Sequence, residues 1–268
     1  MASTIVTYLQ SLSSKYYLKN DSNEIVKIDN SLSNLLNNID KELGYLIKRR
    51  FVFGSYDRDT ILPRDYDKYS DIDLMVVFNT TDFERTPETY RTWLKNFADK
   101  YYKDRYGSEV VKEYPTVTIR LNHIKYDLVP AKEEKGFFST SLYIPNKDSI
   151  WQQTDPYSIK ENLIEANTKY NSIVRPIIRL MKAWNAKSNY PYNSYELELF
   201  ITEQNFYGDN IQEGFFHAIK QLSPNWNDSQ TKKDKIEILK NKIEQVIICI
   251  NNNDIIKAKQ HLHHVLPY

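Results

Sequence analysis

The sequence predicts an α+β fold in which a lobe built around a mixed sheet precedes a helical lobe. Apolar runs at residues 51–53 and 72–78, and a later alternating segment, are typical of strands. From about residue 156 onward, apolar residues recur every three or four positions, which is typical of helices. We therefore expect a first lobe over residues 1–155 and a second, helical lobe over residues 156–268. One arrangement consistent with the sequence packs the N-terminal helix on the second lobe.

Two helices are expected before the first strand. Ser3 or Thr4 is a suitable cap for a helix over residues 6–14. After a polar stretch, leucines and isoleucines at helical spacing predict a second helix over 32–46. This helix is expected to end in the basic run 48–50, because cations are favourable at a helix C-terminus.

The strands of the first lobe are marked by turn signals. The short strand 51–53 is broken by Gly54-Ser55, and the strand 72–78 is apolar enough to be buried. Thr86-Pro87 opens a helix that Gly107 ends. Asn122-His123 separates two segments of alternating polarity, which predicts a β-hairpin with a tight turn.

Composition excludes several classes of protein. The 268 residues include 36 basic and 35 acidic side chains, so the near-neutral charge gives no general attraction to nucleic acid or membranes. No signal peptide and no apolar run of about 18 residues is visible, which predicts a cytoplasmic protein. Cys249, the one cysteine, excludes an intramolecular disulfide and a multi-cysteine zinc site, and its apolar surroundings predict burial. The GxGxxG and GxxxxGK[ST] motifs are absent, so Rossmann and P-loop nucleotide sites are excluded.

A pair of aspartates at the start of the strand 72–78 carries the first indication of chemistry. Residues two apart on a strand face the same way, so Asp71 and Asp73 share a face, and Ile72 and Leu74 share the other. Two neighbouring carboxylates repel each other unless a cation neutralises them. Magnesium takes carboxylate and phosphate oxygens as ligands, so the pair is suited to a nucleoside triphosphate–magnesium complex.

A third carboxylate and a turn complete the constellation. Asp127 lies in the second segment of the hairpin, where it faces away from Tyr126 and Leu128. If this strand lies near the first, Asp127 points to the same place as the pair. Gly54-Ser55 after a short strand is typical of a turn whose backbone N–H groups meet a phosphate.

These motifs resemble a known group of enzymes. FGSYDRDTILP begins at Phe53 and YSDIDLMVVF begins at Tyr69, and both resemble the polymerase-β-type nucleotidyltransferase superfamily. The extended motif GS[YF]xRxT is present as Gly54, Ser55, Tyr56, Arg58 and Thr60. More narrowly, the chain resembles the bacterial CD-NTases of CBASS anti-phage signalling, which are related to cyclic GMP–AMP synthase and oligoadenylate synthase. The long spacer between Ser55 and Asp71 favours this cyclase-like branch.

The resemblance extends to three residues of the later segment. RPIIRLMKAWN, residues 175–185, resembles the family helix whose lysine contacts phosphate, here Lys182. Ser194 begins a segment that resembles the next helix, which opens with a nucleotide-contacting serine. Asn167 corresponds to a position that reads a base edge in some members, and Asn171 is the second candidate. The simpler alternatives are a solvated charge for Lys182 and a helix cap for Ser194.

The resemblance implies a polymerase-β-like lobe with its active site in the cleft beside the helical lobe. Two Mg²⁺ ions, with Mn²⁺ as the alternative metal, would be held by Asp71, Asp73 and Asp127, while Gly54, Ser55 and Lys182 cradle the triphosphate. The implied activity is template-independent synthesis of a cyclic di- or oligonucleotide second messenger from ribonucleoside triphosphates. A separate effector protein would read the product.

The sequence also bears on partners, on a group of histidines and on alternative functions. The animal DNA sensor that resembles this fold grips DNA with a zinc-bound insertion, which a chain with a single cysteine cannot build in cysteine-rich form, so no long nucleic-acid activator is expected. No membrane partner is expected either, because no long apolar run is present. His261, His263 and His264 are interpreted as surface or packing residues, because no acidic partner is close in sequence. Two alternatives stay open, which are an antibiotic- or tRNA-directed nucleotidyltransferase of the same superfamily and a non-catalytic binding module.

Overall fold

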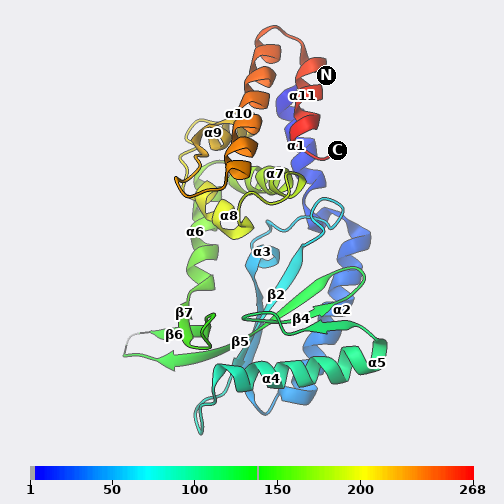
Figure 1. The fold of residues 1–268 in the computed structure, drawn as a ribbon, viewed down its shortest axis with the longest axis vertical. Coiled ribbons are helices and arrows are strands. Elements are labelled where there is room, and N and C mark those ends of the chain that lie inside the picture. Colours follow the sequence, from blue (N-terminus) through cyan, green and yellow to red (C-terminus); the bar gives the residue numbers. More distant parts are fainter. Residues whose placement is uncertain (1–3, 138) are drawn as a thin grey trace. The chain divides into compact units, whose positions relative to one another are not determined.

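The chain divides into two compact units, which are described separately (Figure 1). The computed structural model describes residues 4–137 and 139–268. The sheet unit comprises Ser22–Arg58 and Tyr69–Lys160. The helical unit comprises the described residues up to Asp21, together with Asp59–Lys68 and Glu161–Tyr268. The units are therefore discontinuous in sequence, whereas the sequence pattern predicted one boundary after residue 155.

The sheet unit contains a mixed sheet, as the sequence predicted. Its strands are β1 (Ile47–Phe53), β2 (Asp71–Phe78), β3 (Glu109–Val111), β4 (Val117–Arg120), β5 (Lys125–Lys135), β6 (Thr140–Pro145) and β7 (Trp151–Thr154). The order is β1-β2-β5-β4-β3, and β6 pairs with both β5 and β7. Only the β2–β5 pair among these strands is parallel. This pairing brings together two strands that are far apart in the sequence.

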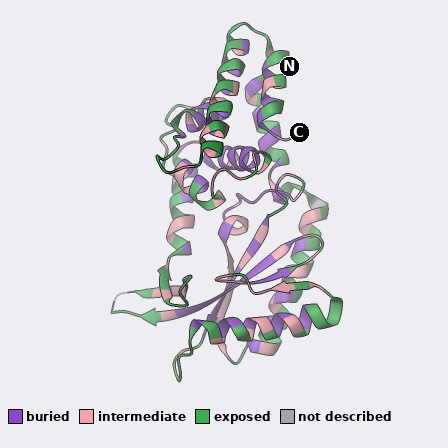
Figure 2. Ribbon diagram, in the orientation of Figure 1, coloured by how far each residue is buried: buried purple, intermediate pink, exposed green. Residues whose placement is uncertain are grey.

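Helices cover one face of this sheet. The helical segments of the unit are α2 (Ser22–Leu43), α3 (Gly54–Asp57), α4 (Pro87–Ala98), a π-helical turn (Asp99–Lys103) and α5 (Asp104–Tyr106). The ring of Phe78 on β2 stacks on that of Tyr90 on α4, with centroids 4.4 Å apart. The hydroxyl of Tyr126 on β5 donates to the carbonyl of Ile28 on α2 at 3.2 Å. The central strands are largely buried, whereas α2 and α4 keep exposed outer faces (Figure 2).

The opposite face of the sheet carries a smaller apolar cluster. Met75 and Val77 of β2, Ala131 of β5 and Leu142 of β6 pack together there. Because side chains alternate along a strand, Asp71 lies on this same face, away from α2 and α4. The apolar cluster therefore fills one end of the face and leaves the start of β2 for polar side chains.

The helical unit is built around one buried helix. It contains α1 (Ile5–Lys15), a 3-10 turn (Leu18–Asn20), most of α6 (Pro156–Lys169), α7 (Val174–Lys187), α8 (Ser194–Thr202), α9 (Ile211–Gln221), α10 (Gln230–Asn251) and α11 (Ile255–Val265). α7 contacts α1, α8 and α9 and is buried on most of its surface. Cys249 of α10 is buried, as its apolar surroundings predicted. No helix within residues 4–137 or 139–268 combines the length and apolar character that a membrane span requires.

The second predicted helix and the strand after it have wrong boundaries. α2 begins at Ser22, because buried Ile28 extends its apolar stripe into the polar stretch, and it ends at Leu43 before Gly44. The basic run 48–50 belongs to β1 instead. Its charges are paired with carboxylates of other elements, Arg49 with Glu133 of β5 and Arg50 with Asp40 near the end of α2. An edge strand tolerates such charged side chains.

Other local predictions are confirmed. Thr4 caps α1, whereas Ser3 lies outside the described residues. Thr86 caps α4, and its side chain accepts a hydrogen bond from the backbone of Thr89. The hairpin around Asn122-His123 forms between β4 and β5, and its register sets Thr118 opposite Asp127.

Candidate active site

Three aspartates meet on one face of the sheet unit. Asp71 opens β2 and Asp73 follows two residues later, so both side chains point to the same face. β5 runs parallel to β2, and the register sets Asp127 beside Asp73. Carboxylate oxygens of the three residues lie within 4.8 Å of one another. Among the described residues, these three aspartates form the one group of acidic, histidine or cysteine side chains that lie close enough together to share a metal ion.

Gly54 lies in close contact with this carboxylate group. β1 places Phe53 beside Asp73, and the chain then turns into α3. Gly54 has a φ of +75°, and a Cβ added to it would lie 2.0 Å from an oxygen of Asp73. A larger residue is therefore excluded by both backbone conformation and space. The Gly54-Ser55 turn thus lies next to the carboxylates, as a phosphate-binding turn would require.

The carboxylates repel one another in the absence of a divalent cation. Burial and the negative charges of Asp71 and Asp127 raise the pKa of Asp73 to about 8. Arg58 and Lys125 act in the opposite direction without cancelling this effect. Burial also raises the pKa of Asp127. Because a divalent cation would relieve the repulsion, and because the donors are all carboxylate oxygens, these residues fit a magnesium ion.

The raised pKa of Asp73 predicts that the metal-free protein loses stability as pH rises. An unfolded aspartate has a pKa near 3.9, so between about pH 4 and pH 8 the folded state binds more protons than the unfolded state. We expect the free energy of unfolding in EDTA to fall through this window, by at most about 1.4 kcal/mol per pH unit from this one group. Urea titrations between pH 5 and pH 8 measure the slope. Asp73→Asn should flatten it, and equal slopes in both proteins would contradict the assignment.

Two residues that touch the carboxylates were not singled out from the sequence. Lys125 of β5 places its Nζ 2.9 Å from Asp71 Oδ2 and 3.2 Å from Asp127 Oδ2. Thr118 of β4 is buried and donates its hydroxyl to Asp127 Oδ1 at 2.6 Å. The sequence pattern indicates both positions, because Lys125 shares the face of Asp127 and the predicted hairpin turn sets Thr118 opposite it.

Lys182 lies in the helical unit and is not a solvated surface charge. Its side chain is 7% exposed, and Nζ lies 3.4 Å from Glu198 Oε2 on α8. The hydroxyl of Thr60 donates to the same oxygen at 2.8 Å. A buried ammonium needs such a partner, so Glu198 fixes where the lysine lies. The phosphate contact implied by the resemblance stays a prediction.

Ser194 and Asn167 also lie in the helical unit. Ser194 is the first residue of α8, but the cap is Asn193, whose side chain accepts from the backbone of Tyr195 and Glu196. Asn167 of α6 is buried, and its Oδ1 accepts the backbone N–H of Arg175 in the first turn of α7 at 3.0 Å. The nucleotide roles of both residues stay predictions.

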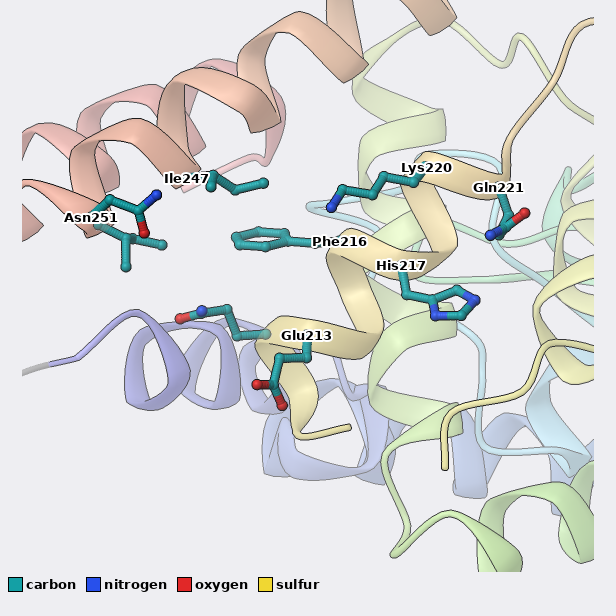
Figure 3. A pocket seen from close by; sticks show the side chains of 9 residues that line it. Glu213, Phe216, His217, Lys220, Gln221, Ile247 and Asn251 are labelled. Carbon is teal, nitrogen blue, oxygen red and sulfur yellow. The ribbon is translucent and has the colours of Figure 1, made fainter. Parts of the chain in front are cut away.

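The helical unit also carries a pocket of about 340 Å³ that the sequence did not indicate. Phe216 of α9 and Ile247 of α10 form part of its apolar wall, and Glu213, His217 and Lys220 lie around it (Figure 3). The polar side chains around this pocket include one acidic and one basic residue, Glu213 and Lys220. They do not form a group of like charges, in contrast to the three converging carboxylates of the sheet unit. The carboxylate group is therefore the stronger candidate for an active site.

A mixed sheet with converging aspartates and an adjoining Gly-Ser turn defines a nucleotidyltransferase fold. Comparisons with solved structures agree. The chain is similar to the CD-NTase CdnG of Bradyrhizobium diazoefficiens solved with GTP, with a TM-score of 0.73, 11% identity and coverage of 98% of this chain and 99% of that one. CdnC of E. coli MS115-1, solved with ATP, gives a TM-score of 0.67, 14% identity and coverage of 95% and 96%. The Vibrio cholerae cyclic AMP-GMP synthase DncV gives a TM-score of 0.61, 16% identity and coverage of 92% and 76%.

Sequence comparisons identify the family. The model of the Second Messenger Oligonucleotide or Dinucleotide Synthetase domain (SMODS) matches residues 4–167, more than half of the chain. The chain therefore belongs to the SMODS family, and the resemblance to bacterial CD-NTases is confirmed. A probable cyclic nucleotide synthase from Bacillus cereus (strain VD146) is 28% identical over an alignment of 123 residues, which covers 42% of this chain. The match spans 37% of that relative's length.

Proposed function

We propose that this chain is a template-independent nucleotidyltransferase that joins ribonucleoside triphosphates into a cyclic di- or oligonucleotide second messenger. The observation that carries the proposal is the convergence of Asp71, Asp73 and Asp127 in a member of the SMODS family. The similar structures solved with GTP and with ATP support nucleoside triphosphates as the substrate class. DncV, solved with the linear intermediate pppA(3′,5′)pG, supports stepwise joining of two nucleotides.

The residues of the sheet unit have separate tasks in this proposal. Asp71, Asp73 and Asp127 would hold two magnesium ions. When bound, the ions lower the pKa of the attacking ribose hydroxyl and neutralise the leaving pyrophosphate. Thr118 holds Asp127 through Oδ1, which fixes the carboxylate and keeps Oδ2 directed at the other groups of the site. Gly54 lets the backbone of α3 approach the same place, where Ser55 would contact the triphosphate. We also propose that Lys182 and Ser194 contact the triphosphate.

Product analysis tests the function directly. The chain is incubated with the four ribonucleoside triphosphates and Mg²⁺, and the products are identified by mass spectrometry. We expect pyrophosphate release and a cyclic product without template or second substrate, no product in EDTA, and activity with Mn²⁺ in place of Mg²⁺. Transfer that occurs only after an aminoglycoside or tRNA is added would establish the alternative nucleotidyltransferase class instead.

The biological role is proposed from the family resemblance. We propose that a separate effector protein reads the product in anti-phage signalling and that long nucleic acid is not the activator. Adding long double-stranded DNA or RNA to the reaction should leave the rate unchanged. Protection of cells against phage, measured by plaque counts, should be lost when Asp71 and Asp73 are both replaced by Asn.

Base choice by Asn167 is tested with a variant that spares its helix-capping role. Oδ1 of Asn167 accepts from Arg175, so base reading falls to the Nδ2 group. Asn167→Asp keeps an oxygen that accepts the backbone N–H of Arg175, and it removes the Nδ2 donor. A lost hydrogen bond is worth roughly 1–3 kcal/mol, so the ratio of incorporated bases should change about tenfold. Liquid chromatography of the products measures this ratio.

A matched variant addresses the second candidate. Asn171 is exposed at a φ of 52°, so Asn171→Gly keeps the turn and removes the amide. A changed base ratio in this variant, with an unchanged ratio in Asn167→Asp, would transfer the role to Asn171.

A further inference from the structure

Lys125 holds its ammonium group inside the carboxylate group. It is the first residue of β5, and the parallel register sets it beside Asp71, the first residue of β2. Its Nζ lies 2.9 Å from Asp71 Oδ2 and 3.2 Å from Asp127 Oδ2. The side chain is 24% exposed, so the contact is partly shielded from water and is not an ordinary surface ion pair.

The ammonium uses oxygen atoms that a metal ion would also need. The three aspartates offer ligand atoms within 4.8 Å of one another. Lys125 pairs with oxygens of two of them, Asp71 and Asp127. An ammonium at these oxygens and a divalent cation held by the same carboxylates would repel each other and compete for the same lone pairs. The lysine therefore has to move away when the carboxylates take a metal, which its four-carbon stem allows.

We propose that Lys125 is an internal counter-cation, which neutralises Asp71 and Asp127 in the metal-free protein and sets the metal concentration at which the site fills. The inference rests on the proposed function, because it requires the three carboxylates to take a divalent metal.

Metal binding to the full chain without nucleotide tests this role. Mn²⁺ affinity is measured by electron paramagnetic resonance of the free ion, and Tm is measured in EDTA and in Mn²⁺. Lys125→Met should bind Mn²⁺ about tenfold more tightly than wild type, because competition and repulsion are removed. Its Tm in EDTA should be lower than that of wild type, and Mn²⁺ should raise it by more. Weaker or unchanged Mn²⁺ affinity in Lys125→Met would overturn the proposal.

Two controls separate charge at the site from charge elsewhere. Lys135→Met makes the same substitution at an exposed position of the same strand, and its Mn²⁺ affinity should equal that of wild type. Lys125→Arg keeps the cation and should not bind Mn²⁺ more tightly than wild type. If Lys125→Met does not fold even with Mn²⁺, Lys125→Gln takes its place in the same comparison. If wild type and Lys135→Met bind no Mn²⁺, the proposed metal site itself is wrong. If they bind Mn²⁺ and Lys125→Met binds it no more tightly, only the counter-cation role of Lys125 is wrong.

Discussion

Replacing Asp71 and Asp73 together by Asn should abolish nucleotide turnover and leave the fold intact. Both side chains lie on the face of β2 that carries the site, whereas Ile72 and Leu74 bury the other face. Amides cannot supply the negative charge that holds the ions, and a bound metal contributes several kcal/mol to catalysis. Since each 1.36 kcal/mol is a factor of ten in rate, the loss should be at least about a thousandfold. Product formation from triphosphates with Mg²⁺ measures it.

The control for this experiment carries the same change of charge. Asp82 and Asp104 are exposed residues of the same unit, so Asp82→Asn with Asp104→Asn should keep full activity. The site double variant should also melt at a higher temperature than wild type in EDTA at pH 8, because carboxylate repulsion is relieved. Residual turnover near the wild-type rate would remove these residues from the catalytic assignment.

Glu198→Ala should be among the most destabilising single substitutions in the helical unit. Glu198 is 2% exposed and accepts a hydrogen bond from buried Thr60 while pairing with buried Lys182. Removing one partner of a buried ion pair leaves an uncompensated charge and costs about 3–5 kcal/mol. Urea denaturation, followed by circular dichroism, measures the loss in free energy of unfolding.

Two further variants identify the cause of that loss. Glu196→Ala removes an exposed glutamate in the first turn of the same helix and should cost at most about 1 kcal/mol. The double variant Glu198→Leu with Lys182→Met replaces the pair by apolar groups and should recover much of the lost stability. A cost below about 1 kcal/mol for Glu198→Ala would mean that the pair does not support the core.

The face on which each carboxylate lies was predictable from the sequence. Alternation along a strand fixes that Asp71 and Asp73 share a face, and the turn at Asn122-His123 fixes the orientation of Asp127 within its hairpin. The end of α2 was harder to predict from the sequence, because basic residues suit a helix C-terminus as well as an edge strand. The antiparallel pairing of residues 47–53 with β2 distinguishes the two.

The fold class and the candidate site of three aspartates with the Gly54-Ser55 turn were predictable from the sequence, because they depend on local periodicity and on a motif contained in short segments. The parallel pairing of β2 with β5 was visible in the three-dimensional fold and not in the sequence pattern, and it sets Asp73 beside Asp127 and Lys125 beside Asp71. It also decided that Lys182 shares Glu198 with Thr60. The physical reason is that local pattern encodes which face of an element is buried, whereas the partner across that face depends on packing between segments distant in the chain.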